Sequence, residues 1–252
     1  LYKVIENHPD PLAIYGGQLI EEKVISAEEF EDMKNMLNQM LNARLSDARA
    51  NPKSSIRPIF IKFWDHIRSA TPEDFDYSPE TKVSKEKLLE LGRTLNTLPP
   101  NKNFYNKTVK LLEKRREMLQ DGTSLDWAVC EQLAYATLLT EGFPIRFTGQ
   151  DVERGTFSHR HAVLVVEDSE EKIYPLENFS PGQAMFRIYN SLLSEYAVLG
   201  YEYGYSMVNP DTLTIWEAQF GVFANGAQII FDQYISSSEE KWNLTGNLVV
   251  LL

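Results

Sequence analysis

The stretch SLLSEYAVLGYEYGY, residues 191–205, places a single acid, Glu195, at the head of a run of small, aliphatic and aromatic residues. An acid in the first turn of a helix is favoured by the helix macrodipole, so a purely structural role is as well supported as a functional one. If neighbours such as Leu193 and Tyr196 bury the carboxyl group, desolvation keeps its proton available for a ligand nitrogen. The residue types therefore predict either a helix-capping acid or a buried general acid.

A polar loop, GQDVERGTFSHRHAV at residues 149–163, gathers acids, arginines and histidines between two expected strands. The simplest interpretation is a solvated loop whose charges pair with one another. His159 and His161 are two residues apart, so in an extended segment they point to opposite sides and are poor candidates for a shared metal. We assign no metal ligands, since no zinc, EF-hand or P-loop spacing occurs in the chain.

A third candidate is WEAQFGVFANGAQ at residues 216–228, where Phe220 and Phe223 lie three residues apart beside Gln219. Aromatic residues at this spacing more often belong to a core than to a ligand site. These two lie at the junction between an expected strand and an expected helix, however, and parallel sheets bind ligands where their strands end. The position favours a stacking platform for a flat ring.

The elements expected to position these residues form an α/β domain after residue 122. A helix at 124–142 is followed by strands at 144–149, 161–168, 212–220 and 248–252, with helices at 191–205 and 223–235 between them. Helices alternating with nearly continuous apolar strands indicate a parallel sheet covered on both faces.

Residues 1–122 are expected to be mainly helical. Ser26 and Glu29 have the spacing of a capping box and begin a long amphipathic pattern. The proline-containing stretch at 51–60 ends that helix and opens a loop-rich segment to about residue 83. Two further helices are expected at 85–95 and 106–119. We identify no chemistry in this half.

The composition limits the class of protein. The chain has 252 residues, 43% of them hydrophobic, which is enough for a packed core. A formal net charge of -11 argues against a nucleic-acid partner, since such binding relies on Lys and Arg. The one cysteine, Cys130, fits a reducing compartment, and no apolar run has the length of a membrane span. The chain stops within its last expected strand and starts without Met, so we expect it to be part of a longer polypeptide.

Three motifs carry a family resemblance: GQDVERGTFSHRHAV, NSLLSEYAVLGYEYGY and TLTIWEAQFGVFANGAQIIFDQYIS. Together they closely resemble the thiamine-diphosphate-dependent E1 component of the 2-oxoglutarate dehydrogenase complex. HPDPLAIY, ATPEDFDYSPETKVSKEKLLELG and SLDWAVCEQLAYATLLTEG are also similar to that family. The resemblance therefore covers essentially the whole chain, and three long motifs in the right order make it highly specific.

The resemblance implies an α/β fold: a transketolase-like pyrimidine-binding domain with a parallel sheet flanked by helices at 123–252, after a helical inter-domain region at 1–122. In the family another domain holds the diphosphate of thiamine diphosphate through a Gly-Asp motif and Mg²⁺. No GDG followed by a suitably placed Asn occurs in this chain. We therefore expect the chain to follow a missing diphosphate-binding domain. We also expect its pyrimidine domain to be truncated at the C-terminus, before a histidine motif of the family.

The resemblance also implies residue roles. Glu195 would share a proton with a ring nitrogen of the aminopyrimidine, as both a catalytic and a cofactor-binding residue. Phe220 and Phe223 would pack on that ring, Gln219 would lie within reach of its polar edge, and Leu193 is assigned to the same cofactor site.

The resemblance says less about the roles of two further residues. His161 lies in a family motif beside the active-site cleft, and we mark it as a candidate catalytic residue without a defined proton-transfer role. Val222 stands where the family usually has Asp, as QFGDF. Valine cannot make the polar contact that an aspartate would make. The departure therefore puts that contact, and with it the catalytic activity of this protein, in question.

The implied function is an E1 subunit that decarboxylates 2-oxoglutarate oxidatively with thiamine diphosphate and passes the succinyl group to a lipoyl-bearing E2 in the tricarboxylic acid cycle. It would be a homodimer working with E2 and E3, in a bacterial cytoplasm or a mitochondrial matrix, with no nucleic-acid or membrane partner. The alternatives are a 2-oxoadipate dehydrogenase, a 2-oxoglutarate decarboxylase, or a non-catalytic structural subunit. This chain alone is expected to be inactive, because half of the cofactor contacts are absent.

Overall fold

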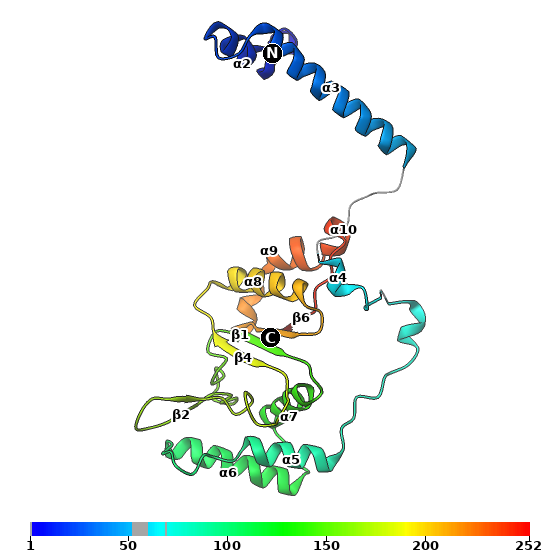
Figure 1. Cartoon of the computed structure of the whole chain (residues 1–252). Helices are drawn as coiled ribbons and strands as arrows, with labels where there is room; N and C mark the ends of the chain where they lie inside the picture. The colour runs from blue at the N-terminus through cyan, green and yellow to red at the C-terminus, as the bar shows by residue number, and fades with distance from the viewer. Residues whose placement is uncertain (1, 52–59, 69) are drawn as a thin grey trace. The chain divides into compact units, whose positions relative to one another are not determined.

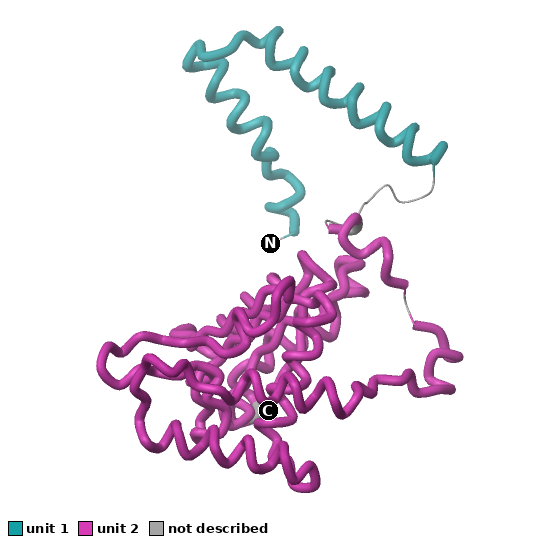
Figure 2. Tube along the Cα trace, turned by 60° about the horizontal axis from the view of Figure 1, so that its bottom comes forward, with its two compact units in different colours: residues 1–57 teal, residues 58–252 magenta. Residues whose placement is uncertain are grey.

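The computed structural model describes residues 2–51, 60–68 and 70–252, without the side chains of Ile61 and Ala224. The chain divides into two compact units, residues 1–57 and 58–252 (Figure 2). Each unit has its own internal contacts and is described by itself. Among the described residues, no helix has both the length and the apolar character needed to cross a bilayer.

The described residues of the first unit form three helices, α1 (Tyr2–Glu6), α2 (Pro11–Glu21) and α3 (Ala27–Ala50). The expected capping box is confirmed: Ser26 Oγ accepts from the amide of Glu29, and the Glu29 carboxylate accepts from the amide of Ser26. Gly16 of α2 allows the ring of Phe30 to approach closely, because a Cβ there would lie 2.3 Å from the ring. The apolar side chains of α3, Met33, Met36, Leu37, Met40, Leu41 and Leu45, are exposed.

The second unit begins with short elements and then forms three longer helices. The loop-rich segment contains α4 (Ile61–Trp64) and the 3-10 turn η1 (Pro72–Phe75), while residues 52–59 and 69 of it lie outside the described residues. The helices expected at 85–95 and 106–119 are confirmed as α5 (Lys85–Leu95) and α6 (Asn106–Asp121). Helix α7 (Trp127–Thr140) follows, with Gly122 between α6 and α7 at φ 68°, a value that glycine adopts easily.

A four-stranded parallel sheet lies at the centre of the second unit, in the order β4-β1-β5-β6 (Figure 1). Its strands are β1 (Ile145–Gly149), β4 (Phe186–Asn190), β5 (Leu213–Glu217) and β6 (Leu248–Leu251). The elements between and after them are β2 (Leu164–Val165), β3 (Lys172–Ile173), α8 (Glu195–Val208), the 3-10 turn η2 (Gln219–Ala224), α9 (Gln228–Ile230), the π-helical turn η3 (Phe231–Ile235) and α10 (Ser238–Trp242).

The two faces of the sheet are buried in separate apolar clusters, which confirms the expected sheet covered on both sides. Alternate side chains of a strand point to opposite faces, so Ile215 joins the cluster under α5, α6 and α7, while its neighbour Trp216 joins the cluster under α8 and α9. Figure 1 shows α7 and α8 on opposite sides of β1 and β4. Since Leu91 and Leu119 belong to the first cluster, α5 and α6 pack with the α/β part of the chain. The domain boundary at residue 122 stays a prediction.

The sequence-based strand assignments were wrong in one place and incomplete in another. The apolar stretch at 161–168 does not enter the parallel sheet: only Leu164–Val165 is a strand, and it pairs with β3 in an antiparallel ribbon. Leu164 and Val166 are apolar because they pack on Phe104 and Leu112. The sheet instead gains β4, which was not predicted. The helix expected at 223–235 forms only from Gln228 onward.

The N-cap of α7 carries a first prediction about stability. Asp126 has an extended backbone, and its Oδ1 accepts from the amide of Val129 at 2.8 Å, which satisfies one free N–H of the helix start. Asp126→Ala should lower the free energy of unfolding by about 1 kcal/mol, whereas Asp126→Asn, which keeps an acceptor, should lower it by a few tenths. Denaturant unfolding of the chain measures both variants. Equal losses for Ala and Asn would contradict the capping role.

Candidate functional site

The register of the sheet brings the ends of its strands to one edge. Asn190 of β4, Gly149 of β1 and Glu217 of β5 are in register, and Leu251 of β6 pairs with Glu217. Ligands of parallel sheets bind outside this carboxyl edge. The three segments that leave these strand ends lead into Gln150, α8 and η2, so the edge is where the candidate residues should converge.

Glu195 is the first residue of α8 and is partly buried. Its Oε1 accepts a hydrogen bond from Nε2 of Gln150, at 3.3 Å, and this contact links the ends of β1 and β4. The position in the first turn is favourable for an acid. This polar contact between the segments that follow two strands is the first site feature that the sequence did not reveal.

The expected burial of Glu195 by its neighbours is wrong for this chain. Leu193 is 48% exposed and Tyr196 is 54% exposed. Helical periodicity explains the exposure of Tyr196, because α8 turns Val198 and Leu199 into the core and leaves Tyr196 on another face, while Leu193 lies before the helix begins. The apolar neighbours of Glu195 are therefore available as a surface and do not enclose its carboxylate.

The aromatic pair after β5 forms as expected. The rings of Phe220 and Phe223 are stacked, with centroids 6.3 Å apart and planes 24° apart. Both rings are largely solvent-accessible, at 61% and 83%, so they do not belong to the core. Two exposed parallel rings at a strand end provide a surface on which a flat ligand ring can stack.

An unusual backbone holds these rings outward. Residues 220–223 all have positive φ, between 45° and 58°. Each L-residue in this conformation costs about 1–2 kcal/mol, and strained backbone of this kind clusters at functional sites. Val222, where the family has Asp, points inward: it is buried and packs with Val198 and Leu199. In this chain the position is therefore apolar core and offers no polar contact to a ligand.

A small cavity of about 180 Å³ opens beside the aromatic pair. Gln219 lies in its wall, and its Nε2 donates to Oγ1 of Thr156 at 2.9 Å, joining η2 to the loop at 149–163. Phe157 meets Phe220 edge to face. His159 also lines the cavity, and its Nδ1 is buried with no hydrogen-bond partner among the described residues. An unsatisfied buried nitrogen of this kind is suited to a ligand or a bound water.

His161 lies in a different place from the other candidates. It lines a cavity of about 320 Å³ with Tyr105, Glu153 and Arg154, and neither Gln219 nor Phe220 takes part in that cavity. Burial lowers the pKa of His161, and the positive charge of Arg115 lowers it further, so the neutral ring is favoured. Its assignment as a catalytic residue stays a prediction. Within the described ranges, no three His, Cys, Asp or Glu side chains are grouped so that they could hold a metal ion.

A buried ionic network lies directly behind the first cavity and was not predicted. Arg160 is 2% exposed; its Nε donates to Glu131 of α7 at 2.9 Å, and its Nη atoms bind the carboxylate of Glu217 at the end of β5. Burial alone would lower the pKa of Arg160. The bonds to Glu217 and Glu131 have the larger effect, so the pKa of Arg160 is raised. The only sequence signal was an arginine between two histidines in a polar loop.

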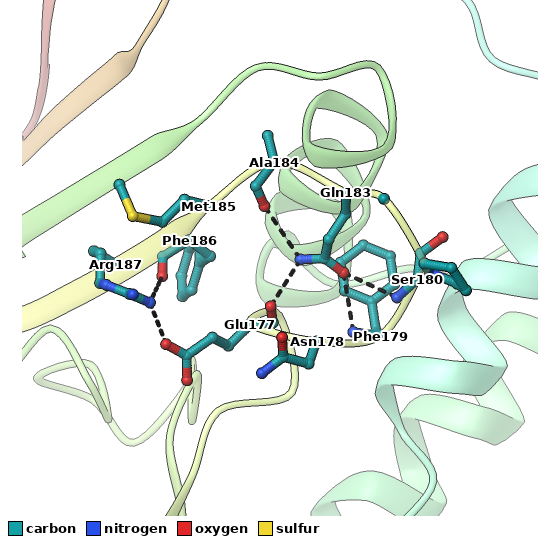
Figure 3. A pocket seen from close by; sticks show the side chains of 11 residues that line it. Glu177, Asn178, Phe179, Ser180, Gln183, Ala184, Met185, Phe186 and Arg187 are labelled. Carbon is teal, nitrogen blue, oxygen red and sulfur yellow. Dashed lines mark hydrogen bonds and ion pairs between the residues drawn. The ribbon is translucent and has the colours of Figure 1, made fainter.

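A larger hollow of about 630 Å³ lies at the other edge of the sheet, where β4 begins (Figure 3). The loop around it is braced by Gln183, whose Oε1 accepts from the amides of Phe179 and Ser180 at 2.9 Å. Its Nε2 donates to main-chain carbonyls, including that of Leu176 at 2.8 Å. Because this loop satisfies its polar groups internally and lies at the amino edge, we place the candidate site at the carboxyl edge.

The carboxyl edge thus offers a carboxylate, an amide and an exposed aromatic surface. Such a set suits a flat heteroaromatic ring with nitrogen atoms at its rim. A parallel sheet covered by helices, with an acid at the start of the helix after one strand, is the arrangement that the sequence resemblance led us to expect of a pyrimidine-binding domain. Residues 123–252 match the family described as the transketolase, pyrimidine binding domain, and the chain belongs to that family.

The similarity to individual proteins extends over the whole chain. It is 42% identical over its 252 residues to the 2-oxoglutarate dehydrogenase E1 component of Brucella anthropi. The identity is 41% over the same length to the proteins of the same name from Brucella ovis and Brucella canis. The resemblance drawn from the motifs is therefore confirmed, and family membership with these relatives implies thiamine diphosphate as the cofactor. The chain covers 25% of the length of each of these relatives.

Proposed function

We propose that this chain is the part of a 2-oxoglutarate dehydrogenase E1 component that binds the aminopyrimidine of thiamine diphosphate. The proposal is carried by one observation: Glu195, Gln219 and the exposed Phe220–Phe223 pair all follow strand ends at one edge of the sheet. The full protein would decarboxylate 2-oxoglutarate oxidatively and pass the succinyl group to a lipoyl-bearing E2. When bound, thiamine diphosphate supplies the electron sink for loss of carbon dioxide.

The residues of this chain would bind and orient the ring. Phe220 and Phe223 present their faces for stacking, and Gln219, already held by Thr156, offers its amide to the polar rim. The Glu195 carboxylate exchanges a proton with a ring nitrogen, and its single long bond to Gln150 leaves acceptor capacity for that contact. Leu193, half exposed before α8, provides an apolar contact to the same ligand.

The remaining assignments concern the whole protein. Mg²⁺ and the diphosphate would be held by a domain outside this chain, and the protein would act as a homodimer with E2 and E3 as partners. The named relatives are bacterial, which supports a cytoplasmic location; a mitochondrial matrix is the counterpart for a eukaryotic source. The net charge of -11 supports the absence of a nucleic-acid partner.

The test uses the full-length protein. Carbon dioxide release from 2-oxoglutarate should require both thiamine diphosphate and Mg²⁺, and succinyl transfer should require a lipoyl domain. Faster turnover of 2-oxoadipate than of 2-oxoglutarate would assign the protein to the neighbouring dehydrogenase. Release of carbon dioxide without transfer to lipoyl would indicate a decarboxylase.

A non-catalytic subunit is retained as a second candidate because of Val222. This position is buried in an apolar cluster, so a polar group of the family is replaced by core packing. Calorimetry separates the candidates: a structural subunit should bind no thiamine diphosphate in the presence of Mg²⁺. Tight binding together with turnover would remove this candidate.

A further inference from the structure

Arg115 of α6 reaches into the site from outside the region matched to the family, residues 123–252. It is 1% exposed, one of the most buried charged side chains in the described chain. Its Nη2 donates to the main-chain carbonyls of His159 and Arg160, both at 2.7 Å, and its Nη1 donates to Oε1 of Gln132 at 3.2 Å. One nitrogen of the guanidinium, Nη2, thus clamps two successive carbonyls of the loop at 149–163.

The clamp is reinforced from α7. Nε2 of Gln132 donates to the Arg160 carbonyl at 3.0 Å, so that oxygen accepts from both Arg115 and Gln132. The Arg160 side chain extends from the same residue to Glu131 and Glu217. A continuous set of buried contacts therefore runs from α6, through the backbone at 159–160, to the end of β5 where η2 begins.

The clamped backbone carries a cavity residue. His159 lines the cavity beside Gln219 and Phe220, and its ring packs on Gly155, where a Cβ would lie 2.5 Å from the ring. Gly155 has φ 82°, so both the close contact and the backbone favour glycine there. Because the ring rests on a turn of the same loop, its position follows the carbonyls that Arg115 holds.

The oxygens that Arg115 binds are neutral, which is costly for a buried cation. Burial lowers the pKa of Arg115. A guanidinium kept in the interior for stability alone is usually paired with a carboxylate, and here Glu131 is bound by Arg160 instead. The placement is better explained by the need to bind three oxygens with two nitrogens in one plane: Nη2 holds the two carbonyls and Nη1 holds Gln132, an arrangement that the single nitrogen of lysine does not reproduce.

We propose that Arg115 is a positioning residue for the cofactor cavity: it holds the His159–Arg160 backbone so that Thr156, His159 and Gln219 form one wall. The residue acts through the loop and does not touch the ligand. This inference deepens the proposed function and depends on it for the choice of ligand. The clamp itself is tested separately below.

The experiment compares Arg115→Lys with Arg116→Lys in the full-length protein. Arg116 is the next residue of α6 and is only partly buried; no hydrogen bond or ion pair joins it to the described residues of the loop, so it serves as the matched control. In Arg115→Lys, hydrogen–deuterium exchange of the peptide at 156–161 should accelerate roughly tenfold, as expected for loss of hydrogen bonds to a charged donor, while exchange in β1 stays unchanged. Affinity for thiamine diphosphate in the presence of Mg²⁺ should fall about tenfold.

A second variant covers the case in which Arg115→Lys folds poorly. Gln132→Leu removes one donor to the Arg160 carbonyl without altering any charge, and it should give the same pattern with smaller changes. Unchanged exchange at 156–161 in both variants would overturn the clamp. Faster exchange with normal affinity would overturn the link to the cavity. If the unmodified protein binds no thiamine diphosphate, the proposed function fails, while the exchange data still decide the clamp.

Discussion

Glu195→Gln in the full-length protein should reduce the exchange of the cofactor C2 proton with solvent by about 10²–10⁴-fold, the usual contribution of a positioned acid–base group. The amide has nearly the same size and can still accept from Gln150, so packing at the start of α8 is retained. It cannot exchange a proton with a ring nitrogen. Exchange followed by NMR at fixed cofactor saturation measures the effect without requiring the complete complex.

Two controls define the result. Glu113→Gln makes the same change at an exposed position of α6 and should leave exchange unchanged. Glu195→Asp keeps the carboxyl group but shortens its reach by one methylene, so it should recover part of the rate. Near-normal exchange in Glu195→Gln, with cofactor bound, would refute the proposed role. Loss of cofactor binding in that variant would instead assign Glu195 to affinity.

Arg160→Leu should lower the free energy of unfolding by about 3–5 kcal/mol, the largest stability effect expected in this chain. The substitution removes the cation that Glu131 and Glu217 share and leaves both carboxylates partly buried without it. It also removes the guanidinium from the face of Phe147, 4.6 Å from the ring centroid. Denaturant unfolding of the chain, followed by far-UV circular dichroism, measures the loss.

Arg154→Leu is the matched control. Arg154 belongs to the same loop and pairs with Asp151, but this pair is far more accessible to water, at 52% and 33% side-chain exposure. Exposed pairs of this kind contribute about 0–1 kcal/mol, so the control should be close to the unmodified chain. A loss below about 1 kcal/mol for Arg160→Leu would show that the buried network does not stabilise the loop. Partial recovery on adding Glu131→Gln would identify the unpaired carboxylate as the cause.

The two predictions concern residues at different depths beside the carboxyl edge of the sheet. Glu195 lies at the surface of the site, where a ligand can reach it, and Arg160 lies behind the site, where it ties α7 to β5. Val222 lies at the same edge of the sheet. Its buried side chain adds to the apolar cluster under α8, while the adjacent rings of Phe220 and Phe223 remain exposed. The rings are therefore held outward by a turn whose centre is anchored in the core.

Several elements could be predicted from local signals alone. The capping box at Ser26, the helical period of α5 and α6, and the apolar runs of β1, β5 and β6 all depend on neighbours within a few residues. The same holds for the candidate acid at a helix start and the aromatic pair after a strand. The motifs were also sufficient to predict the family, and the comparisons with known proteins confirmed it.

Other features were decided only in three dimensions. Strand β4 alternates Phe186 and Ile188 with Arg187 and Tyr189, and its role as an edge strand depends on pairing with β1. The stretch at 161–168 has the composition of a strand because it packs on Phe104 and Leu112. Both assignments require a partner far along the chain.

By itself the sequence determined which residue types could act in this protein: an acid before a helix, two phenylalanines and a glutamine after a strand. Only the tertiary structure decided their surroundings. It left Leu193 and Tyr196 exposed and separated His161 from His159. It also joined Arg115 to the backbone of the loop and Arg160 to Glu217 at the end of β5. The physical reason is that burial and ion pairing depend on how distant segments pack: Glu131 of α7, Arg160 of the loop and Glu217 of β5 meet only in the folded chain, and no local pattern encodes that packing.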